Sequence, residues 1–388
     1  MKIALVTSSD LSHRGGAERH VQALARGLAH RGAEVELLAP GFAYGSRRVV
    51  ERDGVIVRCF PSMVGPVRFA IAPGLWERLR LGAGGFDLVD VHSADPRLAL
   101  AVIRSGVRRC VFTAQAPSGR LIGWPQIRTT AAVLGGVSEI VCFSSAERDV
   151  LCERFPELWH RASVVPIGID TAAIQAARPF PRPGRVVLVV GRLERGRRID
   201  RAIAAIAGLA PGFRLVVVGD GPLLHRLRAH AADLRVSSRA HFLGAVADLE
   251  LYRWLRTARV VVALHDDHSS GIHVGEALAA GAPLVASELP VHREAAARFD
   301  GARVKFVSPR GSPFEVADAI AELARGDTTS PPTAVDRGLP SQEAVLDRVW
   351  DLYQRLINGA EPIADQEEGA PVGLAAGGQT TDELIRLR

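Results

Sequence analysis

The sequence predicts an α/β protein with two parallel-sheet domains. Short apolar runs recur along the chain, each followed by a polar or glycine-containing loop and then by residues at helical spacing, which is the alternation found in parallel sheets. The chain has 388 residues, which suits two domains of about 150 to 200 residues better than one core. Three prolines and a glycine within residues 171–185 predict a linker between the domains.

We expect the first domain over residues 1–170. Apolar runs predict strands at 3–7, 35–39, 88–91, 109–113 and 140–143. A helix after the first strand is indicated by apolar residues at helical spacing, namely Val21, Leu24, Ala25 and Leu28. Ser144 and Glu147, after the last of these strands, have the spacing of a capping box at the start of another helix.

We expect the second domain over residues 186–340. Buried-type strands are predicted at 186–190, 214–218, 259–264 and 284–287. An amphipathic pattern predicts a final helix over 341–358, and the Gly-, Ala- and acid-rich residues 359–388 are predicted to be a disordered tail.

The composition excludes several classes of protein. Hydrophobic residues make up 47% of the chain and charged residues 23%, which is typical of a globular protein. No uncharged apolar run approaches the roughly 18 to 20 residues that a membrane-spanning helix needs. The first residues predict a strand that enters a polar loop, not a signal peptide. We therefore expect a soluble, cytoplasmic protein.

The net charge and the spacing of the cysteines limit the kinds of ligand and partner that we expect. The net charge is +6, but residues 359–388 carry −4, so that the rest of the chain carries +10 and suits phosphates or anionic lipid. No Lys/Arg-rich run alternates with aromatic residues, and we expect no nucleic-acid partner. The cysteines lack paired spacing and are interpreted as core residues: Cys59, Cys110, Cys142 and Cys152.

Loops that follow predicted strands contain the residues expected at a phosphate site, and ligands of parallel sheets bind at these strand ends. Residues 14–20 contain paired glycines that open a helix, whose N–H groups and positive dipole suit an anion; a tight turn is the alternative. Residues 190–198 place several arginines after a strand, and one guanidinium can donate two hydrogen bonds to phosphate oxygens. The alternative is that this segment is a solvated turn. Residues 219–222 form either a further ligand loop or a turn before a helix.

The segment 265–283 is the most informative. Glu276 is a lone carboxylate among small apolar residues of a helix, so that it needs a hydroxyl or cationic partner. The three histidines and two aspartates of this segment match no zinc spacing, and we expect no metal site.

Taken together and in order, these segments resemble the family 4 group of retaining glycosyltransferases of the two-domain GT-B type. The resemblance extends from residue 1 to about 358 and rests on 15–20, 165–170, 191–193, 219–222, 242–244 and 271–283. It implies two Rossmann-like domains that face a central cleft, with the final helix crossing back to the first domain.

The resemblance also implies roles for particular residues. Arg192 and Arg197 would hold the donor diphosphate, and Glu276 would bind the ribose hydroxyls; these are the implied catalytic residues. Gly16 would bring its N–H close to a donor phosphate. The other residues implied on the donor side are Gly191, Leu243, Gly244, His268, Ser270, Gly271 and Ile272.

The chain departs from the family pattern at two places that face the transferred sugar. His268 stands at the first glutamate of the E-x7-E motif, with Ser269 and Ser270 in place of Gly-Phe, and Gln115 stands where the family has a histidine. Histidine cannot accept two hydroxyl hydrogen bonds as a carboxylate does, and we expect a different donor sugar or a different pose. Replacement of that carboxylate by Asp266 or Asp267 is the alternative.

Acceptor contacts are expected from the first domain. The candidates follow predicted strands there: Asp10, His13, Arg14, His92 and Gln115. The apolar segment 60–76 is interpreted either as a wall that faces an acceptor or lipid, or as a helix and loop that pack on the core.

The resemblance implies a retaining transfer of a hexosyl group from a nucleoside-diphosphate sugar, with UDP favoured, to the hydroxyl of a small molecule or glycan. Biosynthesis of a natural product of the aminoglycoside kind or of an envelope glycan would use such a reaction. The chain has no Asp-x-Asp motif, which agrees with a metal-independent reaction and no cofactor besides the donor co-substrate. The alternatives are a lipid acceptor with peripheral membrane contact, a sugar-nucleotide-binding protein that has lost transfer, and an epimerase of the same fold.

The predicted tail can be tested by truncation. Deleting residues 362–388 should leave the melting temperature and the donor affinity unchanged, because a disordered segment makes few buried contacts. A fall of several degrees in a thermal melt would show that the tail docks on the domains.

Overall fold

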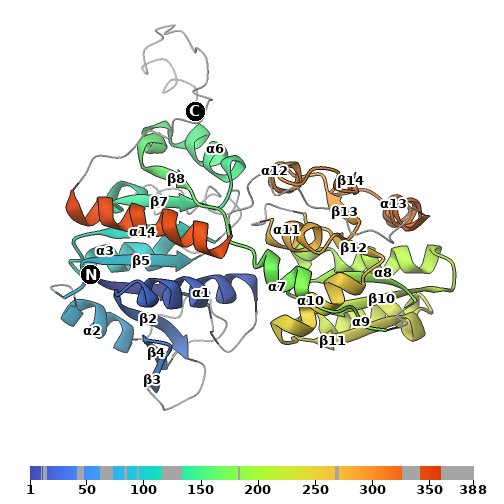
Figure 1. Cartoon of the computed structure of the whole chain (residues 1–388), viewed down its shortest axis with the longest axis horizontal. Helices are drawn as coiled ribbons and strands as arrows, with labels where there is room; N and C mark the ends of the chain where they lie inside the picture. Colours follow the sequence, from blue (N-terminus) through green and yellow to red (C-terminus); the bar gives the residue numbers. More distant parts are fainter. Residues whose placement is uncertain are drawn as a thin grey trace, which may run out of the picture.

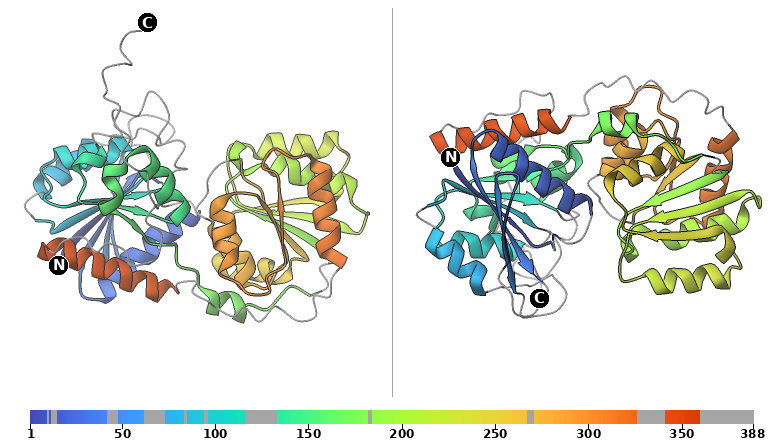
Figure 2. Two further views of the ribbon diagram at one scale, coloured as in Figure 1. Left: turned by 90° about the horizontal axis from the view of Figure 1, so that it is seen from above. Right: turned by 60° about the horizontal axis from the view of Figure 1, so that its bottom comes forward.

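The computed structural model describes residues 1–9, 11, 15–41, 48–61, 73–82, 85–93, 96–115, 133–181, 184–266, 271–325 and 341–359. Over these residues the chain forms two α/β domains that lie side by side (Figure 1). Figure 2 shows helices on both faces of each central sheet. The predicted α/β class with two parallel-sheet domains is confirmed.

The first domain has, in its described residues, an eight-stranded sheet in the order β3-β4-β2-β1-β5-β6-β7-β8. The strands are β1 (Lys2–Thr7), β2 (Glu34–Gly41), β3 (Arg48–Arg52), β4 (Val55–Pro61), β5 (Leu88–Ser93), β6 (Cys110–Ala114), β7 (Glu139–Cys142) and β8 (Ala162–Val164). Among the strands that the structure describes in this domain, only β3 pairs antiparallel, with β4. The helices are α1 (Gly16–His30), α2 (Pro73–Gly82), α3 (Pro96–Arg104) and α6 (Ser145–Arg154), with a 3-10 helix η1 (Pro156–Arg161).

The second domain has a six-stranded sheet, over the residues described, in the order β11-β10-β9-β12-β13-β14. All its pairs are parallel. The strands are β9 (Arg185–Val190), β10 (Phe213–Val218), β11 (Ala240–Gly244), β12 (Val260–Ala263), β13 (Leu284–Ser287) and β14 (Val304–Val307). The helices are α7 (Thr171–Ala176), α8 (Ile199–Gly208), α9 (Leu224–Asp233), α10 (Asp248–Thr257), α11 (Ile272–Ala279), α12 (Pro290–Ala297) and α13 (Pro313–Arg325), with the 3-10 helices η2 (Arg195–Arg197) and η3 (Ser237–Arg239).

The order of the strands in each sheet indicates where a ligand would bind. In the second domain the order reverses between β9 and β12, and in the first domain it reverses between β1 and β5. Ligands of doubly wound sheets bind at such a switch point, outside the carboxyl ends of the strands. The loops after β1 and β9 therefore lie where a ligand would be expected.

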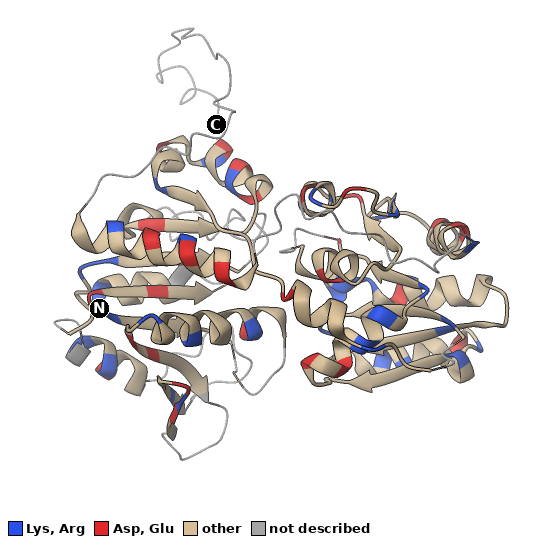
Figure 3. Ribbon diagram, viewed as in Figure 1, with Lys and Arg blue, Asp and Glu red and all other residues tan. Residues whose placement is uncertain are grey.

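The final helix α14 (Gln342–Asn358) crosses back to the first domain, as the resemblance implied. Its buried residues Val345, Val349 and Leu352 share one core with the β1 residues Ile3 and Leu5. Figure 1 shows α14 beside α1 on the first domain, although the second domain precedes it in the sequence. On the face drawn in Figure 3, basic and acidic residues alternate along α14, so that the positive charge forms no uniform patch there.

A buried polar group fixes α14 in place. The Tyr353 hydroxyl donates a hydrogen bond to Asp90 Oδ2, and the Thr113 hydroxyl donates one to Asp90 Oδ1 at 2.9 Å. Burial opposes ionisation of Asp90, but His92 and the two hydroxyls outweigh it and hold the pKa of Asp90 below its ordinary value. The hydroxyl of Tyr353 thus stabilises a charge that is deep in the first sheet.

The capping box predicted at the start of α6 is confirmed. Ser144 Oγ accepts a hydrogen bond from Glu147 N at 3.1 Å, and Glu147 Oε2 accepts one from Phe143 N at 2.8 Å. The next two backbone N–H groups, of Ser145 and Ala146, donate to the carboxylate of Glu294 in α12 at 3.1 and 3.2 Å. The N-terminus of α6 therefore holds an anion from the second domain.

The segment expected to be a linker, 171–185, is partly structured. It begins with α7, which Asp170 caps by accepting a hydrogen bond from Ala173 N at 2.9 Å. Ile174 and Ala177 are buried in the core of the second domain. The helix ends before the three prolines, which is why the composition of the whole segment indicated a linker.

The apolar segment 60–76 packs on the core where the structure describes it. Phe60 in β4 and Leu75 in α2 are buried in the first domain, and Trp76 packs against the same core. For these residues the interpretation as an acceptor-facing wall is wrong, because they contact the sheet. Residues 62–72 lie outside the described part, as do 360–388 of the predicted tail.

The anchor of α14 gives a stability prediction. Tyr353→Phe should lower the free energy of unfolding at pH 7 by about 1.5–3 kcal/mol, the usual contribution of a hydrogen bond to a charged group. Tyr252→Phe is the control, because the Tyr252 hydroxyl has no hydrogen-bond partner among the described residues. Urea unfolding of the two variants measures the difference, and equal losses would contradict the role given to the Tyr353 hydroxyl.

Candidate functional site

The N-terminus of α1 is built for close approach. Gly15 is its N-cap residue and Gly16 its first residue. A Cβ on Gly15 would lie 2.1 Å from Glu18 Oε2, and one on Gly16 would lie 3.4 Å from Ile272 Cγ2 in the second domain. A side chain in place of Gly15 would therefore displace the Glu18 carboxylate, and Gly16 lies at van der Waals distance from the second domain.

The N-terminus of α11 meets α1 at this point. Its N-cap residue, Gly271, has φ 66°, a left-handed conformation that glycine adopts without strain. Ile272, the next residue, is the one that faces Gly16. Two helix N-termini, each carrying unpaired N–H groups and partial positive charge, therefore converge between the domains. The structure brings the predicted residues Gly16, Gly271 and Ile272 together.

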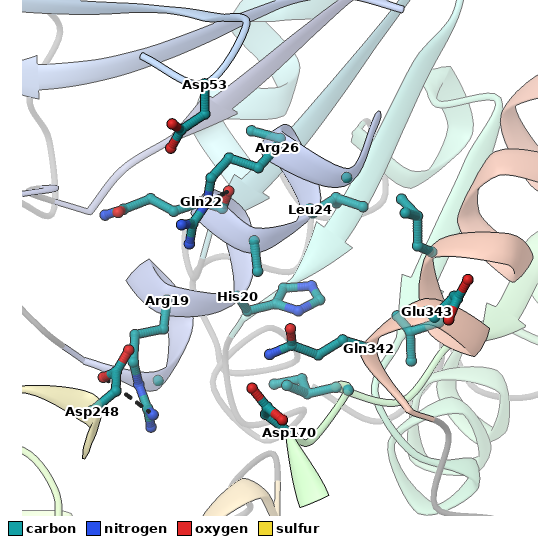
Figure 4. A pocket seen from close by; sticks show the side chains of 18 of the residues that line it. Arg19, His20, Gln22, Leu24, Arg26, Asp53, Asp170, Asp248, Gln342 and Glu343 are labelled. Carbon is teal, nitrogen blue, oxygen red and sulfur yellow. Dashed lines mark hydrogen bonds and ion pairs between the residues drawn. The ribbon is translucent and has the colours of Figure 1, made fainter. Parts of the chain in front are cut away.

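Two crossed ion pairs join the domains. Arg192 Nη2 donates to Glu18 Oε1 at 2.7 Å, and Arg19 Nη2 donates to Glu276 Oε1 at 2.8 Å. Arg19 Nη1 also lies 3.6 Å from Asp248 Oδ1 in α10, the contact drawn in Figure 4. Adjacent residues of α1 with opposite charges thus pair with two of the predicted catalytic residues.

The carboxylates of both ion pairs are buried, which strengthens their electrostatic interaction with the arginines. Glu18 is 1% exposed and Glu276 is 4% exposed. Burial alone would raise the pKa of Glu276, but Arg19 and His273 outweigh it and hold that pKa below its ordinary value. Burial likewise works against the charge of Arg19, and Glu276 with Asp248 raises the pKa of Arg19 nonetheless. The sequence predicted a hydroxyl or cationic partner for Glu276, and in this structure the partner is Arg19.

Several buried polar atoms at this junction have no hydrogen-bond partner in the described structure. They are Glu18 Oε2, Arg19 Nε, His273 Nδ1 and Glu276 Oε2. Buried polar groups are nearly always paired, and an unpaired cluster between two domains indicates a place for a polar ligand or water.

Glycines let the loops after β9, β10 and β11 pack on one another. Gly191 N donates to Val218 O at 3.0 Å, and Gly219 N donates to Gly244 O at 2.8 Å. A Cβ on Gly219 would lie 2.0 Å from Gly191 O, which no larger residue tolerates. Beside this stack, the predicted donor-side residue Leu243 is 38% exposed. The predicted glycines 191 and 244 thus shape the floor of the site.

The predicted diphosphate residues lie on this floor. The side chain of Arg192 is 40% exposed and also lies 3.5 Å from Glu194. The Arg197 guanidinium contacts His265 Nε2. Burial, followed by Arg197, lowers the pKa of His265 well below its ordinary value, so that His265 is neutral at pH 7 and accepts from the arginine.

The predicted acceptor residues are placed only in part. His92 is 1% exposed, with Nε2 3.1 Å from Asp90 Oδ2 and its ring against His20. Burial and His92 lower the pKa of His20 to about 3. Gln115, at the carboxyl end of β6, has a buried Nε2 without a partner. The predicted residues Asp10, His13, Arg14, His268 and Ser270 lie outside the described part.

A cavity of about 1050 Å³ extends from this junction along α1 (Figure 4). Its lining joins Arg19 and Glu276 to Asp248, Tyr252, Asp170 and Gln342. Elements of both domains, the connection between them and the start of α14 thus surround one space.

No cluster of three or more His, Cys, Asp or Glu suited to a metal occurs in the described residues. Among the helices that the structure describes, none is long and apolar enough to cross a membrane.

Two Rossmann-type sheets whose carboxyl ends meet across a cleft, with helix N-termini and arginines between them, define a GT-B glycosyltransferase. The family follows from the sequence: residues 14–173 match the model of Glycosyltransferase Family 4 and residues 170–331 match that of Glycosyl transferases group 1. The chain belongs to the family 4 glycosyltransferases, enzymes that use a nucleotide sugar.

Known proteins of similar sequence include mannosyltransferases. The chain is 27% identical to the phosphatidyl-myo-inositol mannosyltransferase of Mycolicibacterium smegmatis, over 84% of each chain. It is 29% identical to the protein of the same name from Mycobacterium leprae, over 84% of this chain and 88% of that one.

Solved structures share the fold. Sucrose-phosphate synthase of Thermosynechococcus elongatus superposes with a TM-score of 0.72 at 18% identity, covering 93% of this chain and all of that one. HepE of Anabaena, solved with UDP-glucose, gives a TM-score of 0.71 at 18% identity, covering 92% and 100%.

Residues that the sequence analysis did not assign complete this site. Glu18 and Arg19 were within a recognised motif, and their opposite charges directly after paired glycines were the available signal. Which charge each would pair with depends on the second domain, which no local pattern reveals.

The Arg19–Glu276 pair predicts a measurable coupling. A double-mutant cycle of Arg19→Met and Glu276→Gln in urea unfolding should give about 1–3 kcal/mol, because the two groups contact each other in a buried site. Because the pKa of Glu276 is lowered, the coupling should be complete above the ordinary value of 4.5 and lost as the pH falls through the lowered pKa.

The control cycle uses Arg293→Met and Glu288→Gln, an ion pair whose side chains are 58% and 50% exposed. Such exposed pairs contribute at most about 1 kcal/mol. A coupling in the Arg19–Glu276 cycle no larger than in this control would contradict a buried bridge between the domains.

Proposed function

We propose that this enzyme transfers a hexosyl group, with retention of configuration and without a metal ion, from a nucleoside-diphosphate sugar to an acceptor hydroxyl. The observation that carries the proposal is the convergence of Arg192, Arg197 and two helix N-termini at one interdomain junction. This is an arrangement that stabilises a departing diphosphate.

The proposed chemistry is mainly electrostatic. As the bond between the sugar and the diphosphate breaks, negative charge builds on the leaving phosphate and the sugar becomes oxocarbenium-like. Fixed arginines in a cleft that excludes water stabilise that charge more than water would. The acceptor hydroxyl attacks from the face that the diphosphate leaves, and its proton passes to the leaving phosphate.

Donor binding would exchange charges at the domain junction. Arg192, now paired with Glu18, would turn to the diphosphate, and Glu276, now paired with Arg19, would accept hydrogen bonds from the ribose. Arg197 is held by neutral His265 and would keep its full charge for the phosphate. We favour a uridine nucleotide, and the UDP-glucose complex of HepE, which has the same fold, supports this choice.

For the acceptor we propose a polyhydroxylated molecule such as a glycan or a small natural product. A lipid-linked polyol at a membrane surface is the second candidate, favoured by the mannosyltransferases that resemble this chain along most of its length. Vesicles with and without phosphatidylinositol, offered with the donor, separate the two candidates by whether transfer needs the lipid.

The decisive experiment is a thermal-shift screen against UDP, GDP, dTDP and ADP and their sugars, followed by assay of nucleoside-diphosphate release. A ligand that binds the folded state raises the melting temperature by mass action. A protein that has lost transfer would bind and release no diphosphate, and an epimerase would convert the donor alone. Turnover that is unchanged in EDTA would support a metal-independent reaction. A product whose anomeric configuration is the same as that of the donor would support retention.

The arginines give a direct mutational test. Arg192→Ala and Arg197→Ala should each reduce transfer at least about 100-fold without loss of fold, because each removes a charge-assisted contact that strengthens as the diphosphate leaves. Arg197→Lys should be milder than Arg197→Ala. Wild-type kcat in either alanine variant would remove the assignment, and circular dichroism checks the fold.

A further inference from the structure

Three buried histidines from different elements gather on the floor of the cleft. His265 follows β12 and is 3% exposed, His273 lies in the first turn of α11 and is 9% exposed, and His292 in α12 is 0% exposed. The rings of His265 and His273 are parallel at 6.4 Å, and those of His265 and His292 meet edge to face at 5.0 Å.

Two of these histidines have clear partners. His292 Nδ1 is 2.8 Å from Ser287 O, which fixes that ring between α12 and the end of β13. His265 Nε2 contacts the Arg197 guanidinium. In His273, as in His265, Nδ1 is buried without a hydrogen bond, and in His273 it lies 3.6 Å from Glu276 Oε2. Nδ1 of His273 therefore has bonding capacity that the described residues leave unused.

His273 lies beside the expected phosphates. The position that a Cβ would take on Gly191 is 3.6 Å from His273 Nε2 and 3.9 Å from Arg197 Nε. Gly191 follows β9 at the switch point of the sheet, and His273 is the second residue of α11. One ring nitrogen thus faces the loop that is expected to hold the diphosphate, and the other faces Glu276.

We propose that His273 is a third ligand of the donor diphosphate, which it binds as an imidazolium with Nδ1–H directed to Glu276 and Nε2–H to a phosphate oxygen. The inference rests on the proposed function, because it uses the same diphosphate site. The proton comes from solvent when the donor binds, and it returns to solvent when the diphosphate leaves the site.

The charged groups around His273 determine whether its imidazole is protonated. Facing it, among the described residues, are Glu276 on its own helix, Arg19 on α1, Arg197 in η2, His265 after β12 and His292 on α12. Burial, with Arg197 and Arg19, lowers the pKa of His273 below its ordinary value of 6.5 against the opposite effect of Glu276. The free protein therefore holds His273 neutral at pH 7.

A bound diphosphate reverses that balance. Its negative charge would pair with Arg197 and lie close to Nε2, and both changes favour the charged imidazole. The pKa of His273 thus rises on binding, so that the donor takes up a proton at any pH between the two values. By linkage, donor affinity falls as the pH rises from the pKa of the free protein to that of the complex, and it levels off above the latter.

Calorimetry of the full-length protein tests the proposal. UDP-glucose and GDP-mannose are suitable probes, because a diphosphate esterified at both ends has no group that titrates between about pH 5 and 8. Titrations at pH 7 in two buffers of different ionisation enthalpy should show uptake of up to about one proton by the wild type, and Kd should rise up to about tenfold per pH unit between the pKa of the free protein and that of the complex.

His273→Gln should abolish both the uptake and the extra pH dependence, while binding at pH 8.5 stays close to that of the wild type. His160→Gln is the control, an exposed histidine in η1 of the first domain that should behave as the wild type. His273→Asn replaces the glutamine variant if circular dichroism shows that the latter does not fold.

The outcomes separate the two proposals. Proton uptake that is absent in the wild type, or that persists in the folded His273 variant, would overturn the role of His273 while leaving sugar-nucleotide binding established. Absence of binding by every sugar nucleotide to the wild type would overturn the proposed function itself.

Discussion

The arrangement of the site depends on how the first turn of α1 meets the second domain. Glu18 and Arg19 are adjacent, and they pair across the junction with Arg192 and Glu276. Each buried carboxylate of the junction is thus paired with an arginine of the other domain, and Arg19 helps to hold the pKa of Glu276 below its ordinary value. Arg192 and Glu276, which we propose to bind the donor, are each paired in this structure with a residue of α1.

Close packing makes these pairs attainable. Gly16 at the start of α1 lies beside Ile272, and the glycines after β9 and β10 let neighbouring loops stack through their backbones. At the opposite side of the interface, the N-terminus of α6 binds the carboxylate of Glu294 from the second domain. Backbone N–H groups and compact loops therefore set the distance between the domains, and the long arginine side chains then complete the contacts.

The structure describes the surroundings of one departure from the family pattern, Gln115. Gln115 keeps a buried, unpaired amide at the carboxyl end of β6, in keeping with a polar ligand near that position. The second domain places three histidines around Arg197, and their buried rings are neutral because burial and the nearby arginine disfavour their protonation. The protonation of these histidines therefore depends on the charge of a ligand bound beside them.

The sequence by itself determined the class of fold, the strands that follow its apolar runs, the capping box of α6 and the amphipathic α14, because each depends on local periodicity or spacing. It missed the β3–β4 hairpin, although Asp53-Gly54 is a turn signal and both residues have positive φ, and it missed the short edge strands β8, β11 and β14. Within the site it indicated the loops and the need of Glu276 for a hydroxyl or cationic partner. Only the tertiary structure decided that the cation is Arg19, that Arg192 pairs with Glu18 and that His273 faces Gly191, since residues so distant in sequence meet only when both sheets are complete.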